Sequence, residues 1–187
     1  MDQIIQTEET TSFPESIHSE GVVYKDKIWL IEKIVANFKG FKKEYFVANS
    51  GERAGVLVVY DDHVLLVRQY RLLLNDLSYE IPGGKVDGNE SPLLAAIREC
   101  HEETGLLLEE AHPLIGFNPT LDCDRNYTHI FYAQPAAVER IPTSENHTWL
   151  PFNDCMEMIT KGVISDSLTV IALLAYLTKI KLSATEK

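Results

Sequence analysis

The chain has 187 residues, enough for one well-buried domain, and its hydrophobic content of 45% is ordinary for a globular protein. Its 17 basic and 28 acidic residues give a formal net charge of −11, which argues against a surface that binds nucleic acid or an anionic membrane, because both attract basic patches. A small anionic substrate is still compatible with this charge where metal ions and a few arginines reverse it locally.

Cysteine usage and hydropathy predict a cytoplasmic protein that does not cross a membrane. The 3 cysteines are odd in number and lack CxxC spacing, which favours reduced thiols. The N-terminal MDQIIQTEETTSF has no signal-peptide pattern. The longest apolar run, Val170 to Leu177, is far shorter than the ~18 residues that a membrane span needs.

The first part of the chain predicts a loosely ordered segment and then a small antiparallel β-sheet. Residues 1–19 are polar and mixed in character. Within residues 20–50, Ile28–Val35 is rich in β-branched and aromatic residues, Asn37–Gly40 resembles a turn, and Phe41–Val47 provides a return strand.

Residues 51–187 alternate strands and helices, as expected for a mixed-sheet α/β domain. The predicted strands are Ala54–Tyr60, His63–Tyr70, Ser78–Ile81, Leu114–Phe117 and Tyr127–Ala133. The predicted loops are Pro82–Gly84, Asn118–Arg125 and Arg140–Thr148, and helices are predicted over Asn153–Lys161 and Asp166–Ile180.

A short helix with strong end signals is predicted between the third and fourth of these strands. Ser91 is a good N-cap, Pro92 suits the first helical position, and Gly105 is the expected C-terminal stop. At about 100° per residue, one side of this helix is largely apolar and the opposite side is acidic.

Three glutamates, Glu99, Glu102 and Glu103, share the acidic side within an arc of roughly 100°. Like-charge pairs at helical spacing cost roughly 0.2–0.5 kcal/mol each, and a hard cation such as Mg²⁺ would remove that cost. The alternative interpretation is a solvated acidic face, partly compensated by Arg98 four residues before Glu102.

The whole stretch from Gly84 to Leu106 favours the metal interpretation. It fits the pattern Gly-x5-Glu-x7-Arg-Glu-U-x-Glu-Glu-x-Gly-U without a gap, U being a bulky apolar residue. The specified positions are Gly84, Glu90, Arg98, Glu99, Cys100, Glu102, Glu103, Gly105 and Leu106. This is the Nudix box, so the chain resembles a Nudix hydrolase. The resemblance implies an α/β/α sandwich with a mixed sheet and Mg²⁺-dependent cleavage of a diphosphate linked to another moiety, with Mn²⁺ as an alternative metal.

Features outside the box resemble the ADP-ribose pyrophosphatase branch, whose members hydrolyse ADP-ribose and related nucleoside diphosphate sugars. These are VLLVRQYR followed by YEIPGGKVD, the loop Asn118–Arg125, and the ending GVISDSLTVIALLAYL. The resemblance implies AMP and ribose 5-phosphate as products, and a homodimer whose exchanged N-terminal strands help to form the substrate pocket.

Two departures from the branch leave the substrate open. Asn118-Pro119-Thr120 stands where the branch has Ser-Pro-Gly, and Gly83 stands where it has alanine. Another nucleoside diphosphate sugar, such as GDP-mannose or UDP-glucose, is therefore an alternative substrate. A catalytically silent domain that senses ADP-ribose is a further alternative, although such domains usually lack box glutamates that this chain retains.

The resemblance assigns the metal ligands to the box. Glu99 and Glu103 would be the main ligands, Glu102 would contribute directly or through water, and the Gly83 carbonyl would complete a site. We interpret Arg98, with Glu90 as its partner, as a residue that orients the acidic helix. Glycine at Gly84 would let backbone approach a ligand or metal closely.

The general base has two candidates. In this branch an acidic residue on a loop after the box can take the proton of the attacking water, and Glu145 is the best placed by sequence order. Asp124, which matches a glutamate of the post-box loop, is the second candidate. A solvated loop carboxylate is the alternative interpretation for each.

Five residues are candidates for substrate contacts. Arg71 suits bidentate binding of phosphate or ribose oxygens, and Glu80 could accept hydrogen bonds from ribose hydroxyls or assist the metal site. Arg68 either contributes there or ends its strand in solvent. Trp29 could stack on adenine or lie in a core, and Glu44 resembles a position that contacts the base.

Overall fold

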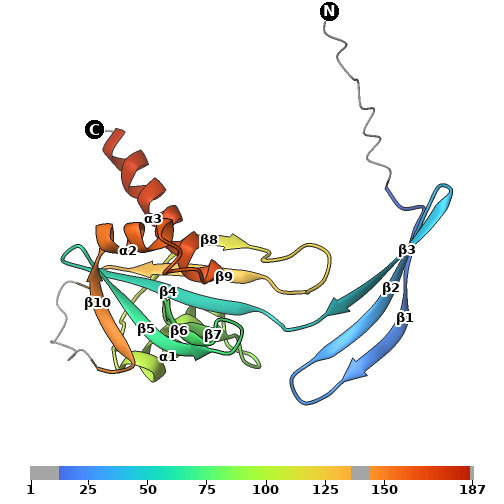
Figure 1. Cartoon of the computed structure of the whole chain (residues 1–187), viewed down its shortest axis with the longest axis horizontal. Helices are drawn as coiled ribbons and strands as arrows, with labels where there is room; N and C mark the ends of the chain where they lie inside the picture. The colour runs from blue at the N-terminus through green and yellow to red at the C-terminus, as the bar shows by residue number, and fades with distance from the viewer. Residues whose placement is uncertain (1–12, 136–143, 186–187) are drawn as a thin grey trace, which may run out of the picture. The chain divides into compact units, whose positions relative to one another are not determined.

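The computed structural model describes residues 13–135 and 144–185, and the chain divides into two compact units (Figure 1). The first unit runs to Ser50 and includes Thr120–Arg125, and the second comprises Gly51–Pro119 and Asn126–Lys187. Residues 1–12 of the predicted loose segment lie outside the described residues. The first strand begins at Ser16, so residues 16–19 belong to the sheet and not to that segment.

The first unit contains the predicted N-terminal antiparallel sheet. Its strands are β1 (Ser16–Lys25), β2 (Leu30–Phe38) and β3 (Phe41–Ala48), in the order β1-β2-β3. The segment Thr120–Arg125 packs against this sheet. Its Asp124 forms a β-bridge with Ala48, and its Arg125 forms an ion pair with Glu32 at 3.0 Å. Much of this predicted post-box loop is therefore part of the N-terminal sheet unit.

The second unit is built on a mixed sheet of seven strands among the described residues. They are β4 (Arg53–Tyr60), β5 (His63–Arg71), β6 (Asp76–Glu80), β7 (Gly83–Lys85), β8 (His112–Phe117), β9 (Thr128–Ala133) and β10 (His147–Pro151). The order is β10-β5-β4-β9-β8, with β6 on β5 and β7 on β4. Strands β4 and β9 run parallel and the other pairs run antiparallel.

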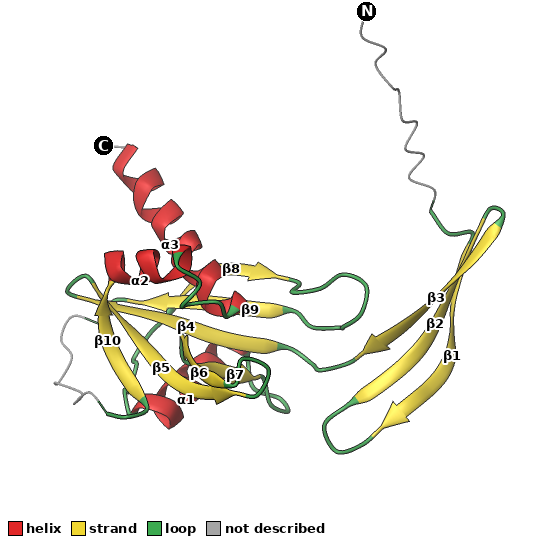
Figure 2. Cartoon of the chain, in the orientation of Figure 1, coloured by secondary structure: helices red, strands yellow, loops and turns green. Residues whose placement is uncertain are grey.

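Helices cover both faces of this sheet, which confirms the predicted α/β/α sandwich. Helix α1 (Pro92–Thr104) lies on one face, and α2 (Phe152–Thr160) and α3 (Ser167–Thr185) lie on the other (Figure 2). Strand β4 alternates between them: Val56 and Val58 pack in the cluster with α1, whereas Leu57 packs in the cluster with α2 and α3. Burial on both faces explains why β4 is a continuous apolar run.

Helix α1 begins and ends as its sequence predicts. The hydroxyl of Ser91 accepts a hydrogen bond from the Leu94 N–H at 3.3 Å. Gly105 has φ of 78°, and its N–H donates to the His101 carbonyl at 2.8 Å. Only glycine adopts this left-handed conformation without cost, so the helix stops there.

Two segments predicted as loops contain strands. Gly83–Lys85 pairs with β4, and a Cβ on Gly83 would lie 2.7 Å from the Ala54 carbonyl oxygen, so the close strand pairing requires glycine. In the predicted loop Arg140–Thr148, residues 140–143 lie outside the described residues, but His147 begins strand β10 beside β5. A five-residue edge strand ending in proline has a weak sequence signal. No helix in the described ranges is long and apolar enough to cross a membrane.

Candidate active site

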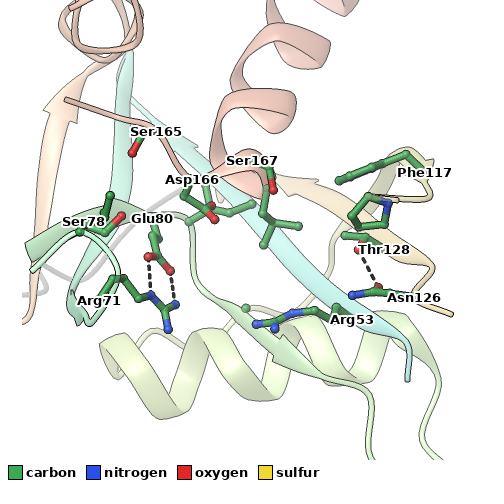
Figure 3. A pocket seen from close by; sticks show the side chains of 15 residues that line it. Arg53, Arg71, Ser78, Glu80, Phe117, Asn126, Thr128, Ser165, Asp166 and Ser167 are labelled. Carbon is green, nitrogen blue, oxygen red and sulfur yellow. Dashed lines mark hydrogen bonds and ion pairs between the residues drawn. The ribbon is translucent and has the colours of Figure 1, made fainter. Parts of the chain in front are cut away.

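The second unit contains a cavity of about 490 Å³ whose lining is rich in polar side chains (Figure 3). Its labelled lining residues are Arg53, Arg71, Ser78, Glu80, Phe117, Asn126, Thr128, Ser165, Asp166 and Ser167. Gly83, which precedes the box glycine, also lines it. The cavity therefore brings arginines, carboxylates and hydroxyls to the start of the box.

Arg71 and Glu80 form a bidentate ion pair at this cavity (Figure 3). The Arg71 Nε donates to Glu80 Oε1 at 2.7 Å, and Nη2 donates to Oε2. The Glu80 side chain is only 9% exposed, whereas that of Arg71 is 45% exposed. The hydrogen bonds that Arg71 donates to Glu80 raise the pKa of Arg71. Two of the five predicted substrate contacts, Arg71 and Glu80, thus lie at the cavity. The Glu80 carboxylate partly neutralises the Arg71 guanidinium.

Arg53 is a second cation at the same cavity. It begins β4, its side chain is exposed, and it has no ion-pair partner within residues 13–135 and 144–185. Near it, the Thr128 hydroxyl donates to the Asn126 side-chain oxygen at 3.1 Å. Arg53 therefore presents a positive charge that no carboxylate of the described chain compensates.

Glu103 is held by two donors. The Gln69 amide Nε2 donates to Glu103 Oε1, and the Gly83 N–H donates to Oε2 at 3.1 Å. Burial raises the pKa of the Glu103 carboxyl, and the nearby charges of Glu99 and Glu80 raise it further, against the lowering by the Gly83 hydrogen bond. Glu103 therefore lies close enough to Glu99 and to Glu80 to be repelled by both.

Arg98 contacts three carboxylates of the box. Its Nη2 lies 2.7 Å from Glu90 Oε1, and its Nη1 lies 2.9 Å from Glu99 Oε1 and 3.2 Å from Glu102 Oε2. Nη2 also donates to the Lys85 carbonyl at 3.0 Å, which ties α1 to strand β7. The hydrogen bonds that Arg98 donates to Glu90 and Glu99 raise the pKa of Arg98. These are contacts expected of a residue that orients the acidic helix, and its guanidinium is fully engaged by them.

Gly84 provides the surface on which Glu99 rests. A Cβ on Gly84 would lie 2.3 Å from Glu99 Oε1 and 2.4 Å from its carboxyl carbon. Any side chain here would displace the Glu99 carboxylate, which is otherwise mostly buried. The first glycine of the box therefore has a steric reason in this fold.

Gly84→Ala is expected to lower kcat about 100-fold, because displacing a reacting group by ~1 Å can cost that much. Gly84 does not have a positive φ, so alanine is not strained there and the melting temperature should change little. Steady-state kinetics and thermal unfolding of the variant test this. An unchanged kcat would show that Glu99 does not need its observed position.

The box carboxylates fit a hard divalent cation by their chemistry. Carboxylate oxygens are the ligands that Mg²⁺ prefers, and a cation would relieve the repulsion that raises the pKa of Glu103. In the part of the chain that the structure describes, no three His, Cys, Asp or Glu side chains converge as a finished metal site. Instead, Arg98 holds Glu99 and Glu102, while Gln69 and Gly83 hold Glu103.

The two candidates for the general base lie in different units. Glu145 is exposed and lies two residues before β10. The carbonyl of the next residue, Asn146, accepts a hydrogen bond from the Arg68 N–H of β5 at 2.7 Å. Asp124 belongs to the first unit, where its carboxylate accepts from the Ser50 hydroxyl at 2.6 Å and from the Ser50 N–H at 3.1 Å.

The remaining predicted substrate contacts do not line the cavity. Trp29 and Glu44 belong to the first unit, and Glu44 pairs there with Lys33 at 3.1 Å. The Arg68 guanidinium lies 5.4 Å from the centre of the Tyr79 ring, a cation–π contact, so it does not simply end its strand in solvent.

Several residues of the site were not predicted. They are Gln69, Arg53, Ser78, Asn126, Thr128, Ser165, Asp166 and Ser167. Gln69 had a weak signal, since it is a polar residue at the end of an apolar strand. The others come from separate strands, from the loop before β9 and from the start of α3 with the loop before it, so only the tertiary fold brings them together.

Comparison with known proteins identifies the family. The NUDIX domain model matches residues 50–169, so the chain belongs to the Nudix family and is a Nudix hydrolase. It is 30% identical over 141 residues to a CMP-5'-(N-acetyl-N-hydroxy-3-aminopropyl)phosphonate hydrolase of Streptomyces rubellomurinus, covering 72% of this chain and 68% of that protein. It is 29% identical over 131 residues to the ADP-ribose pyrophosphatase of Bacillus subtilis, covering 70% and 69%.

Two longer matches extend the comparison. The methanol dehydrogenase activator of Bacillus methanolicus is 29% identical over 171 residues, covering 88% of this chain and 90% of that protein. The crystal structure of an ADP compounds hydrolase superposes with a TM-score of 0.74 at 19% identity, covering 92% and 95% of the two chains. This likeness confirms the fold, including an N-terminal sheet ahead of the Nudix domain.

The raised pKa of Glu103 predicts a pH-dependent stability. A carboxyl whose pKa is higher in the folded protein contributes stability at pH values below its ordinary pKa of 4.5. This contribution is lost as the pH rises through the pKa of the folded protein. In EDTA, Glu103→Gln should therefore melt at a higher temperature than the wild type near neutral pH, with the difference shrinking toward about pH 4. A difference independent of pH, measured by thermal unfolding, would contradict the raised pKa.

Proposed function

We propose that the protein is a Mg²⁺-dependent pyrophosphatase that hydrolyses ADP-ribose, or a related nucleoside diphosphate derivative, to AMP and ribose 5-phosphate. The observation that carries this proposal is the placement of Glu99 and Glu103 with Gly83, beside a cavity that contains Arg53 and Arg71. Hydrolase relatives whose names specify nucleotide substrates support the substrate class.

In this proposal Glu99 and Glu103 hold the metal, with Glu102 and the Gly83 carbonyl as further ligands. When bound there, the cation would supply positive charge against the diphosphate and would make the attacking water more acidic. Gln69 and the Gly83 N–H orient Glu103, and Arg98 orients Glu99, so both carboxylates are preorganised.

The two arginines have different proposed roles. Arg53, which has no carboxylate partner in the described chain, binds a phosphate oxygen directly. Arg71 offers only the donors that Glu80 leaves free, so it binds one phosphate oxygen while Glu80 fixes its orientation. Charge complementarity at the cavity then comes from both arginines and the metal.

The proposed reaction is attack of water on one phosphorus of the diphosphate. A new oxygen–phosphorus bond forms, the bond from that phosphorus to the bridging oxygen breaks, and the bridging oxygen leaves on the other phosphate. Glu145 accepts the water proton as general base; its side chain is exposed and makes no hydrogen bond among the described residues, so it is available.

Product analysis with a substrate panel tests the proposed function. The panel contains ADP-ribose, GDP-mannose, UDP-glucose and a diadenosine polyphosphate, each with Mg²⁺ and each with EDTA. AMP and ribose 5-phosphate should form fastest from ADP-ribose and only with Mg²⁺. Faster turnover of another nucleoside diphosphate sugar would show that ADP-ribose is not the preferred substrate, while the proposed mechanism would stand. Binding of ADP-ribose without turnover of any compound would instead indicate a sensor.

Glu145→Gln is expected to lower kcat about 100-fold, the lower end of what general-base catalysis contributes. Asp124→Asn is its control, because its hydrogen bonds to Ser50 indicate a structural role in the first unit. That variant should melt at a lower temperature and lose less than tenfold in kcat. The kcat of both variants is measured across pH to decide between the candidates. A larger loss of kcat in Asp124→Asn would show that Asp124 is the general base.

We also propose a homodimer that buries the apolar side chains of the N-terminal sheet. Ile17, Val22, Phe41 and Phe46 on its strands are all more than half exposed in the single chain. Exposed apolar patches of this kind usually mark an interaction surface. Light scattering after size exclusion should give twice the chain mass of 21.1 kDa.

A further inference from the structure

Thr169 is a fully buried hydroxyl on the otherwise apolar inner face of α3. Its exposed fraction is 0%, as are those of Ala172 and Leu173 farther along the same helix. A buried hydroxyl without partners costs free energy, so its hydrogen bonds indicate what the residue does.

The Thr169 hydroxyl joins two segments that are far apart in the sequence. It donates to Asp166 Oδ2 at 2.7 Å and accepts from the Ile81 N–H at 2.9 Å. Asp166 Oδ2 also accepts from the Thr169 N–H at 2.9 Å, so the carboxylate caps the first turn of α3. The hydroxyl has one proton, which it donates in the hydrogen bond to Asp166. A lone pair of its oxygen is then left to accept the bond from the Ile81 N–H.

Ile81 lies directly between the two parts of the site. Glu80, the partner of Arg71, precedes it, and Gly83, whose N–H holds Glu103, follows two residues later. Strand β6 ends at Glu80, where its pairing with β5 also ends, and the Ile81 N–H that follows is held by Thr169. The next carbonyl, that of Pro82, is held by the Val56 N–H at 3.0 Å.

We propose that Thr169 is a positioning residue of the carboxylate site. It fixes the segment Glu80–Gly83 to α3, and through the Gly83 N–H it fixes the Glu103 carboxylate. The carboxylate of Asp166 in turn fixes the hydroxyl. For its kinetic readout this inference rests on the proposed hydrolase function, but its hydrogen-exchange readout does not.

The main test is Thr169→Val, which preserves shape and removes the hydroxyl, measured together with Thr169→Ser. Thr178→Val is the control, because Thr178 lies on the same helix and its exposed hydroxyl donates to the Leu174 carbonyl of its own helix. Amide exchange is measured at Ile81 and Gly83 in the metal-free proteins, and Mn²⁺ affinity and the kinetics of ADP-ribose hydrolysis are measured alongside.

Thr169→Val should accelerate exchange at both amides, weaken Mn²⁺ binding and lower kcat by about tenfold each, the lower end for residues that orient metal ligands. KM should change less than about twofold, and Thr169→Ser should restore all values, because only the positioning of Glu103 is affected. Faster exchange at Ile81 alone, with Gly83 and Mn²⁺ affinity unchanged, would overturn the proposal.

A measurement on the wild type keeps the proposal testable if Thr169→Val does not fold. If Thr169 holds the segment Glu80–Gly83 as one unit, the Ile81 and Gly83 amides open together and have equal protection factors. Independent protection of the two amides would overturn the proposal. Absence of hydrolysis with intact coupling of the two amides would instead refute the proposed function alone.

Discussion

Glu103→Gln is expected to lower kcat for ADP-ribose about a thousandfold, which corresponds to about 4 kcal/mol of lost transition-state stabilisation. The substitution retains the shape and one acceptor oxygen for the Gly83 N–H, and it removes the negative charge that would hold the metal. The introduced NH2 group cannot accept the bond that Gln69 now donates to Glu103, so the Gln69 amide must turn its oxygen toward it. Initial rates with saturating substrate and Mg²⁺ measure the effect.

The matched control for this prediction is Glu109→Gln. Glu109 follows α1 and is exposed, so removing its charge changes the net charge equally without touching the site. Its kcat should equal that of the wild type. A Glu103→Gln protein that kept full Mg²⁺-dependent turnover would show that the box carboxylate does not act in hydrolysis.

Arg71→Met is expected to destabilise the protein by about 3 kcal/mol, because it leaves the buried Glu80 carboxylate unpaired. The same change should lower kcat/KM about 100-fold, the size of an interaction worth about 3 kcal/mol with the diphosphate. Urea unfolding gives the first quantity and steady-state kinetics the second.

The double variant Arg71→Met/Glu80→Gln separates the two roles of the pair. Without the buried charge, most of the lost stability should return, whereas kcat/KM should stay low because the guanidinium is still absent. A double variant as unstable as Arg71→Met would mean that the ion pair itself, and not the unpaired carboxylate, determines stability. Recovery of kcat/KM would remove Arg71 from substrate binding.

The box helix and the two-sided burial of β4 were predictable because their signals are local. Ser91, Pro92 and Gly105 set the ends of α1 within one short stretch, and the apolar run of β4 indicates packing on both faces. The need for a glycine at Gly84 was predictable in part, as a place where the backbone approaches another group closely. The steric need for Gly84 became clear only when the fold placed Glu99 against it.

The rest of the site depends on contacts between distant residues. Gln69 reaches Glu103 across 34 residues, and the Ile81 N–H reaches Thr169 across 88. No local pattern encodes such contacts, since they follow from sheet pairing and from the docking of α3. Asp124 shows the converse: a loop carboxylate with the right sequence position is engaged by Ser50 in the first unit.

A Mn²⁺ titration of the wild type and of Glu103→Gln tests whether the box carboxylates hold the metal. The free ion is detected by electron paramagnetic resonance at each step of the titration. We expect the wild type to bind Mn²⁺ at the box and the variant to bind it at least about tenfold more weakly, because one ligand charge is missing. Equal Mn²⁺ affinity of the two proteins would contradict the assignment of the metal to the box carboxylates.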